Sequence, residues 1–156
     1  MTFDARYRPA FDEALAALER AAANLAFTLE RTAGLLPLTA VTAAALAPEA
    51  RERLDALATR FARCQQMAGQ AFKALSLVEA EPQSRFIDLL AMMQKRGLID
   101  DIETWNRQRD LRNDTGHVYF ATDAEFAAFH SAMVLAAPAV IDYARRLREY
   151  AAGIGL

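Results

Sequence analysis

Apolar residues recur at alternating spacings of three and four along three long segments of the chain, which is the pattern of amphipathic helices. The first segment covers residues 9–31. The second begins at Pro48 and continues to residue 78, and the third follows Thr122 to residue 150. Long segments with one apolar face are typical of helices that pack in a bundle or coiled coil. We therefore expect these three helices to supply most of the core.

Two shorter helices are predicted between the second and third segments. Pro82 is placed to open the first of them, and its inner face carries Phe86, Leu89, Leu90 and Met93. Asp100 and Glu103 have the spacing of a capping box and predict the start of the second, which contains Trp105 and continues to residues 111–113. Residues 35–47 have weak periodicity and predict a connection with at most a short helical piece.

These elements predict an all-α fold, an up-and-down bundle of four main helices plus a shorter one, in one domain over residues 1–156. The formal net charge of −2 argues against binding nucleic acid by bulk charge, so any contact with RNA has to be local. The single cysteine, Cys64, lies in an apolar helical register and predicts a buried thiol. With one cysteine and two histidines, neither a metal site nor a cofactor is expected.

The beginning of the chain carries charged residues where a signal peptide would need an apolar core. No uncharged apolar run approaches the length of a membrane span. We therefore expect a cytoplasmic protein without a membrane partner.

One short stretch, residues 112–119, gathers an arginine, an amide, a histidine and a phenol: Arg112, Asn113, His117 and Tyr119. Histidine is the natural base for attack by a ribose 2′-OH on the neighbouring phosphodiester, and arginine stabilises charge at the phosphorus. Asn113 is placed to bind a phosphate or to orient the histidine. Arg112 and His117 would diverge on a continuous helix, so either the helix ends between them or a symmetric dimer brings two copies together.

Alternative interpretations of these residues stay open. The stretch can be a polar helix end, with Arg112 paired to Asp110 or Asp114. Tyr119 can be half-buried against Phe120. Other residues near the stretch are less specific. Arg107 and Arg109 can extend a phosphate-binding surface or form a solvated face, Trp105 is expected in the core, and His130 is expected at a core boundary. The arginines at 145, 146 and 148 are expected on a solvated helix face.

The pattern Arg112-Asn113-x-x-x-His117-x-Tyr119 resembles the signature of the HEPN superfamily. Within it, the chain is most similar to the HepT toxins and the substrate-binding subunits of minimal nucleotidyltransferases. The likeness is best from Arg53 to Tyr119, is plausible to Tyr150, and includes the helices that flank the motif.

This resemblance implies a homodimer whose two motifs line a shared cleft. It also implies a metal-independent endoribonuclease, the toxin of a toxin–antitoxin pair, with Arg112 on the phosphate and His117 as base or acid. The implied antitoxin is a small nucleotidyltransferase, and in such pairs the partner can transfer AMP to the tyrosine of the motif, here Tyr119. RNA, not DNA, is the implied substrate. The alternative is a non-catalytic subunit that presents a substrate, or itself as AMP acceptor, to a nucleotidyltransferase.

Overall fold

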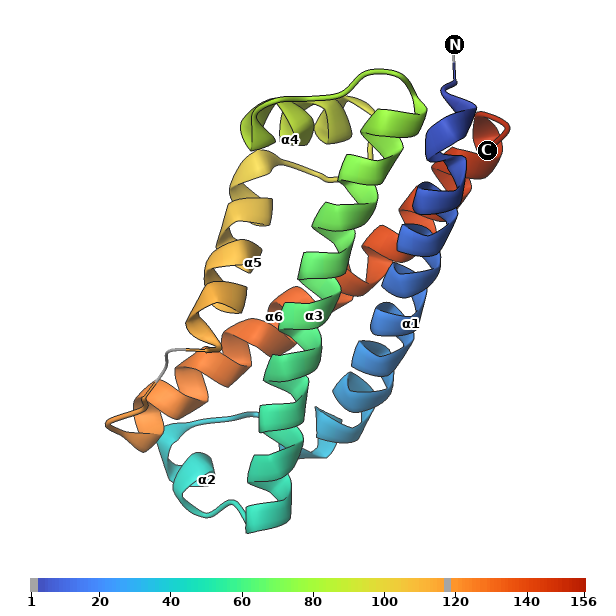
Figure 1. The fold of residues 1–156 in the computed structure, drawn as a ribbon. Coiled ribbons are helices and arrows are strands. Elements are labelled where there is room, and N and C mark those ends of the chain that lie inside the picture. The colour runs from blue at the N-terminus through green and yellow to red at the C-terminus, as the bar shows by residue number, and fades with distance from the viewer. Residues whose placement is uncertain (1–2, 117–118) are drawn as a thin grey trace.

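Six α-helices make up most of the chain in the computed structural model, which describes residues 3–116 and 119–156 (Figure 1). Two 3₁₀ turns, Ala5–Tyr7 and Ala33–Leu35, flank the first helix, and no strand occurs in the described residues. The helices are α1 (Arg8–Thr32), α2 (Ala40–Ala44), α3 (Pro48–Val78), α4 (Phe86–Lys95), α5 (Ile102–Asp114) and α6 (Asp123–Gly153). The predicted all-α class is confirmed.

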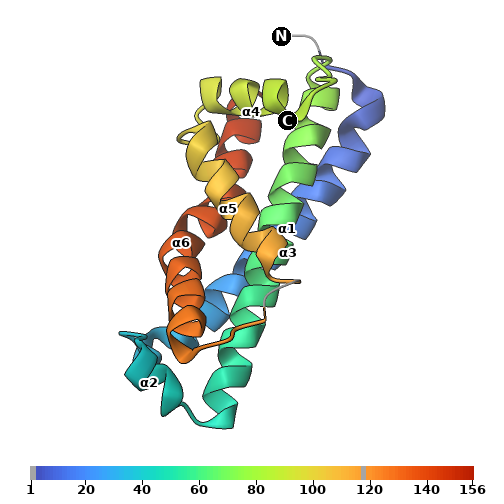
Figure 2. The same ribbon diagram turned by 90° about the vertical axis from the view of Figure 1, so that its left-hand side faces the viewer.

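The four longest helices alternate in direction along the bundle, so that α1 and α5 run one way and α3 and α6 the other (Figure 1). The short helix α4 crosses one end of the bundle, and α2 lies at the opposite end (Figures 1 and 2). Helix α3 packs against α1, α5 and α6 and is therefore the central element. The predicted up-and-down arrangement is confirmed.

The helix ends follow local sequence signals, with two corrections. Pro48 occupies the first turn of α3, and the Thr122 side chain caps α6 by accepting from the Glu125 N–H, both as expected. Helix α5 is capped by Asp101 rather than Asp100, because Asp101 accepts from the Thr104 N–H at 2.6 Å while Asp100 pairs with α6. Helix α4 begins at Phe86 rather than Pro82, because the residue before it, Arg85, has an extended backbone.

Aromatic side chains from three helices meet in the core beside α3. Phe72 of α3, Trp105 of α5 and Tyr143 of α6 lie with ring centroids 5.4–5.8 Å apart, and each is at most 4% exposed. Burying one large apolar side chain contributes roughly 1.5–3 kcal/mol, so this cluster fixes α5 and α6 against α3. Cys64 is also fully buried, and burial raises the pKa of its thiol to about 12, as expected of a structural cysteine.

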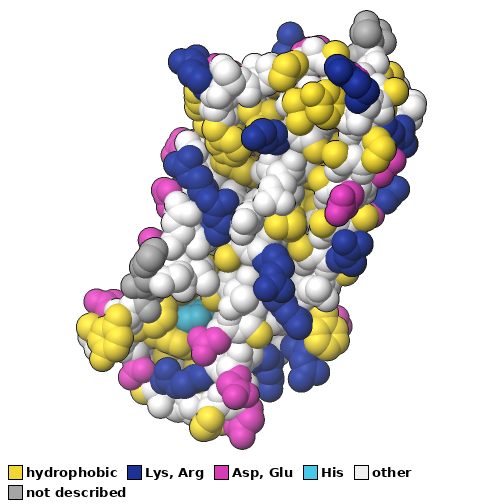
Figure 3. All heavy atoms as spheres, viewed as in Figure 1, with side chains coloured by type: hydrophobic (Ala, Val, Ile, Leu, Met, Phe, Trp, Pro, Cys, Tyr) yellow, Lys and Arg dark blue, Asp and Glu magenta, His cyan; other side chains and the backbone are white. Residues whose placement is uncertain are grey.

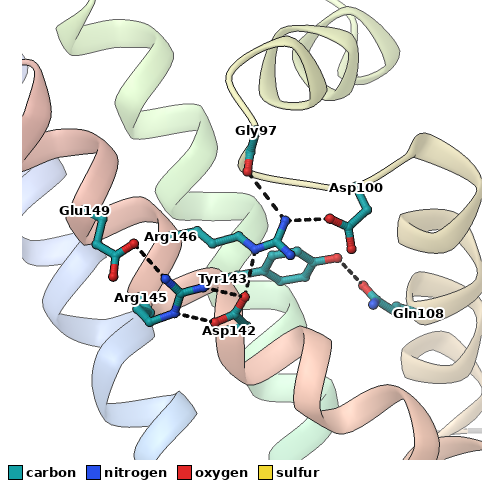
Figure 4. Close-up of polar contacts among 8 residues, drawn as sticks. All are labelled: Gly97, Asp100, Gln108, Asp142, Tyr143, Arg145, Arg146 and Glu149. Atoms are coloured by element: carbon teal, nitrogen blue, oxygen red, sulfur yellow. Dashed lines mark hydrogen bonds and ion pairs between the residues drawn. The ribbon is translucent and has the colours of Figure 1, made fainter.

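Polar side chains on α6 hold the loop before α5 and the body of α5 in place (Figure 4). The buried Tyr143 hydroxyl donates to Gln108 Oε1 at 2.7 Å. Arg146 pairs with Asp100 and with Asp142. Arg145 pairs with Asp142 and Glu149 in the same cluster (Figure 4), and Arg148 pairs with Glu19 of α1. The arginine run of α6 is therefore neutralised within the chain.

Helix α6 has the length and apolar composition that a membrane-crossing helix would need, which the sequence analysis did not anticipate. Only a third of its most apolar window is buried in the bundle. It packs against α1, α2, α3 and α5 through one side, and its other side is left with exposed apolar residues such as Leu135.

An ion pair at the end of the bundle joins α3, α4 and α6. The Glu79 side chain is fully buried, and its carboxylate accepts from the Tyr150 hydroxyl at 2.7 Å and pairs with Arg96 at 2.9 Å. Arg96 also donates to the Tyr150 hydroxyl. Because the carboxylate is buried, removal of its cation leaves an uncompensated charge inside the protein.

We predict that Arg96→Ala lowers the free energy of unfolding by about 3–5 kcal/mol, and Tm by roughly 10 °C, because Glu79 loses its counter-ion. Thermal and urea unfolding followed by circular dichroism measures both quantities. Arg145→Ala is the matched control, since its ion pairs are exposed and should change Tm little. Equal effects of the two variants would contradict the prediction.

Candidate functional site

The guanidinium of Arg112 is held by two neutral amides near the end of α5. Its Nη1 donates to Oε1 of Gln65 on α3 at 2.8 Å. Its Nε and Nη2 donate to Oδ1 of the neighbouring Asn113 at 3.3 and 3.0 Å. Asn113 therefore positions the arginine, and its predicted contact with phosphate or histidine stays a prediction. Arg112 is half-buried and fixed without being neutralised.

Gln65 is the residue of this site that the sequence analysis missed. It is fully buried, four residues after Phe61 and three before Ala68 on the apolar stripe of α3. Its amide nitrogen has no hydrogen-bond acceptor among the described residues, which is uncommon for a buried polar group. A polar residue within an apolar helix stripe is the sequence signal that could have identified Gln65.

No carboxylate pairs with Arg112 among the described residues. Asp110 lies 3.9 Å from Arg109 instead, and Asp114 forms no ion pair with Arg112. Burial, and to a smaller extent repulsion by Arg109, lower the pKa of Arg112 from its ordinary value. An arginine still carries its charge at neutral pH, so the site presents a positive charge that only an incoming anion would neutralise. The alternative interpretation, in which Arg112 pairs with Asp110 or Asp114, is therefore not what the described residues show.

The helix ends between the two ends of the motif, which is one of the two arrangements that the spacing left open. Asp114 is the last residue of α5, and Thr115 and Gly116 form a turn in which the Thr115 hydroxyl donates to the Leu111 carbonyl. His117 lies outside the described residues. Gly116 has a negative φ and open space around it, so the turn itself does not require glycine.

The two arginines before the motif lie on different faces of α5. Arg107 pairs with Glu103 at 2.7 Å and donates to the Thr104 hydroxyl, and it faces α6. Arg109 instead faces α3, on the same side as Arg112. Only Arg109 is therefore placed to extend an anion site at Arg112.

A groove of about 440 Å³ runs between α3 and α5 and ends at Arg112. We call it the α3–α5 groove, and its lining residues are Gln66, Gly69, Gln70, Lys73, Phe86, Trp105, Arg109 and Arg112. This lining contains three cations and no carboxylate. In the space-filling view, basic and apolar side chains lie over the upper part of α3 and the adjoining part of α5, and acidic ones gather over the lower end of α3 and along the margins (Figure 3).

Tyr119 projects from the connection between α5 and α6. It is 90% exposed, so the alternative of half-buried packing against Phe120 is wrong. It borders a second hollow, of about 470 Å³, whose lining includes Arg51, Asp55 and Phe120. The phenol is therefore accessible to an enzyme that would modify it.

His130 is a core residue rather than the boundary residue that was predicted. It is 1% exposed and lies among the rings of Phe120, Phe126 and Phe129, with its Nδ1 2.9 Å from the Phe126 carbonyl. Burial lowers the pKa of this imidazole. It acts as a neutral packing group beneath the connection that carries Tyr119.

We predict that His130 makes the protein less stable as the pH falls. A histidine in the unfolded chain takes up a proton near pH 6.5, whereas the buried one does so only at lower pH. The stability that His130 contributes is complete above pH 6.5 and falls below it, by at most about 1.4 kcal/mol per pH unit. Urea unfolding at pH 7.5 and 5.5 should show a larger loss for wild type than for His130→Phe. Equal losses would contradict the prediction.

Comparisons with known proteins give the chain no relative: no family model, no curated protein and no solved structure matches it. The motif and the geometry around Arg112 are therefore the features that indicate a function.

Proposed function

We propose that this chain is a HEPN-type endoribonuclease, the toxin of a toxin–antitoxin pair, which cleaves RNA through Arg112 and His117 without needing a metal. The observation that carries the proposal is the state of Arg112. Its half-buried guanidinium is fixed by Gln65 and Asn113, which are both neutral, and it stands at the end of a cationic groove. A fixed and uncompensated charge of this kind suits a transferring phosphoryl group, because little reorganisation is needed when charge develops.

In the proposed reaction, His117 takes the proton of a ribose 2′-OH, and the 2′-oxygen attacks the adjacent phosphorus. The bond from phosphorus to the 5′-oxygen breaks, and that oxygen receives a proton. The products are a 2′,3′-cyclic phosphate and a 5′-hydroxyl, so the step is a transesterification with no redox change. Arg112 donates to the non-bridging oxygens, where charge accumulates.

The proposal includes a homodimer, which the exposed apolar side of α6 supports. A second groove, of about 370 Å³, lies between α5 and α6 and is lined mainly by apolar residues, including Leu111, Leu135 and Ala136. Leu135 is 83% exposed in one copy of the chain. A second copy related by a two-fold axis would cover this face and bring the two α5 helices, each of which leads into a motif, close together.

A second candidate function has an observation of its own. Because the phenol of Tyr119 is 90% exposed, it is accessible as an AMP acceptor for a small nucleotidyltransferase. Transfer would join the phenolic oxygen to the α-phosphorus of ATP and release pyrophosphate. If the chain is the toxin, this adduct inhibits its ribonuclease activity. In the alternative function, the chain is a non-catalytic subunit that accepts AMP.

We predict that induced wild-type protein arrests growth and that the purified protein cleaves total RNA in EDTA. Arg112→Ala should slow cleavage at least about 100-fold, because one charged donor to the phosphoryl oxygens is lost. His117→Ala should slow it by a similar or larger factor, because the base is lost. Arg20→Gln, an exposed change on α1, is the control and should cleave like wild type.

The alternative function would be favoured if the wild-type protein does not cleave RNA and a nucleotidyltransferase transfers AMP to Tyr119. Cleavage by wild type that persists undiminished in Arg112→Ala and His117→Ala would contradict both site assignments. Gel analysis of RNA and mass spectrometry of the protein distinguish these results.

We predict that Leu135→Glu separates the dimer, raising its dissociation constant at least about 100-fold, because two unpaired carboxylates would be buried across the two-fold axis. Val41→Glu is the matched control, since Val41 is an equally exposed apolar residue on α2, away from this groove. Sedimentation measures both variants. A monomeric wild type, or a Leu135→Glu variant that stays dimeric, would rule out this interface.

A further inference from the structure

The α3–α5 groove extends well beyond the arginine at its end. Arg112 and Trp105 lie seven residues apart on α5, and Gln66 and Lys73 lie seven residues apart on α3, so each wall is about 10 Å long from the helical rise. Anchoring one phosphate at Arg112 would use only one end of this length. The whole groove, at about 440 Å³, has the volume of a small-molecule site.

The positive charge along the groove is only weakly compensated. Arg109 has one ion pair among the described residues, a long and partly exposed one of 3.9 Å to the neighbouring Asp110, and Lys73 forms no ion pair with a described residue. Burial is the main cause that lowers the pKa of Arg112, and repulsion by the nearby Arg109 adds to it. Such an arrangement attracts a ligand with more than one negative charge.

The far end of the groove is aromatic. Phe86 is 43% exposed although it packs near Trp105, with ring centroids 6.2 Å apart. Gly69 faces both rings, and a Cβ built there would lie 3.6 Å from Trp105 Cζ2 and 3.9 Å from Phe86 Cζ. A methyl group fits at this position, but a longer side chain would extend into the groove. An exposed ring beside a cationic wall is the arrangement with which proteins bind the bases of single strands.

We propose that the α3–α5 groove binds one nucleotide of single-stranded RNA next to the phosphate held by Arg112, with its base against Phe86 and its phosphate between Lys73 and Arg109. This inference rests on the proposed function and names the part of the substrate that the groove holds. Gln66 and Gln70, one helical turn apart on α3, offer amide donors and acceptors to the edge of the base.

The test uses 2′-O-methyl hexa-adenylate, which binds like RNA but lacks the 2′-OH that attacks the phosphorus. Trp105 is the single tryptophan of the chain and lines this groove from the core, so a ligand in the groove would lie next to the only indole that fluoresces. We expect the oligonucleotide to change the emission, with an affinity that falls as salt is added. An abasic oligonucleotide and a hexaglutamate peptide of matched length should leave the emission unchanged and bind at least about tenfold more weakly.

Two pairs of variants locate the site. Arg109→Gln should weaken binding about tenfold and reduce the salt slope by about one, whereas Arg20→Gln should do neither. Gly69→Leu should fill the groove, abolish the emission change and weaken binding about tenfold, whereas Gly69→Ala should bind within about twofold of wild type. Circular dichroism checks that Gly69→Leu is folded, and Arg109→Gln gives an answer that does not depend on it.

The groove assignment is overturned if Arg109→Gln and Gly69→Leu both bind like wild type, or if the abasic or hexaglutamate probe binds as well as hexa-adenylate. The ribonuclease proposal fails separately. If hexa-adenylate binds as expected but unmodified RNA is not cleaved, the groove stands and the ribonuclease does not. If RNA is cleaved through Arg112 while both groove variants bind and cleave like wild type, the ribonuclease stands and the groove does not.

Discussion

The hydrogen bond from Arg112 of α5 to Gln65 of α3 is the contact on which the functional architecture depends. A carboxylate at position 65 would hold the arginine equally well, but it would neutralise the charge. A hydrocarbon side chain would preserve the charge without fixing its position. A buried amide does both, at the cost of leaving its own nitrogen without an acceptor among the described residues.

The rest of the bundle keeps this contact in place. The aromatic cluster of Phe72, Trp105 and Tyr143 joins α5 to α3 and α6, and the bond from Tyr143 to Gln108 sets the rotation of α5. With α5 fixed in this way, positions 105, 109 and 112 face α3. The arginines of α6 form the opposite case, because each of them pairs with carboxylates and contributes to structure rather than to binding (Figure 4).

The helices were predictable because their apolar positions follow the helical period and their caps are local. The start of α5 was misplaced by one residue, since Asp100 and Asp101 are both competent caps and the contact of Asp100 with Arg146 decides between them. Helix geometry alone would have placed Arg107 and Arg109 on different faces of α5, because residues two positions apart on a helix are rotated by about 200°. The burial of His130 and the pairing of Gln65 with Arg112 depend on contacts between distant segments, which no local pattern contains.

The central claim is that the charge of Arg112 is uncompensated. The most direct test replaces its neutral partner, the amide of Gln65, by a carboxylate and leaves Arg112 in place. Gln65→Glu would put a carboxylate beside the guanidinium, and Gln94→Glu makes the same chemical change at an exposed position on α4. The measurement is the rate of RNA cleavage in EDTA by the two folded variants. If an uncompensated Arg112 binds the phosphoryl group, Gln65→Glu loses cleavage at least about 100-fold and Gln94→Glu does not. Cleavage by Gln65→Glu at the wild-type rate would contradict the account.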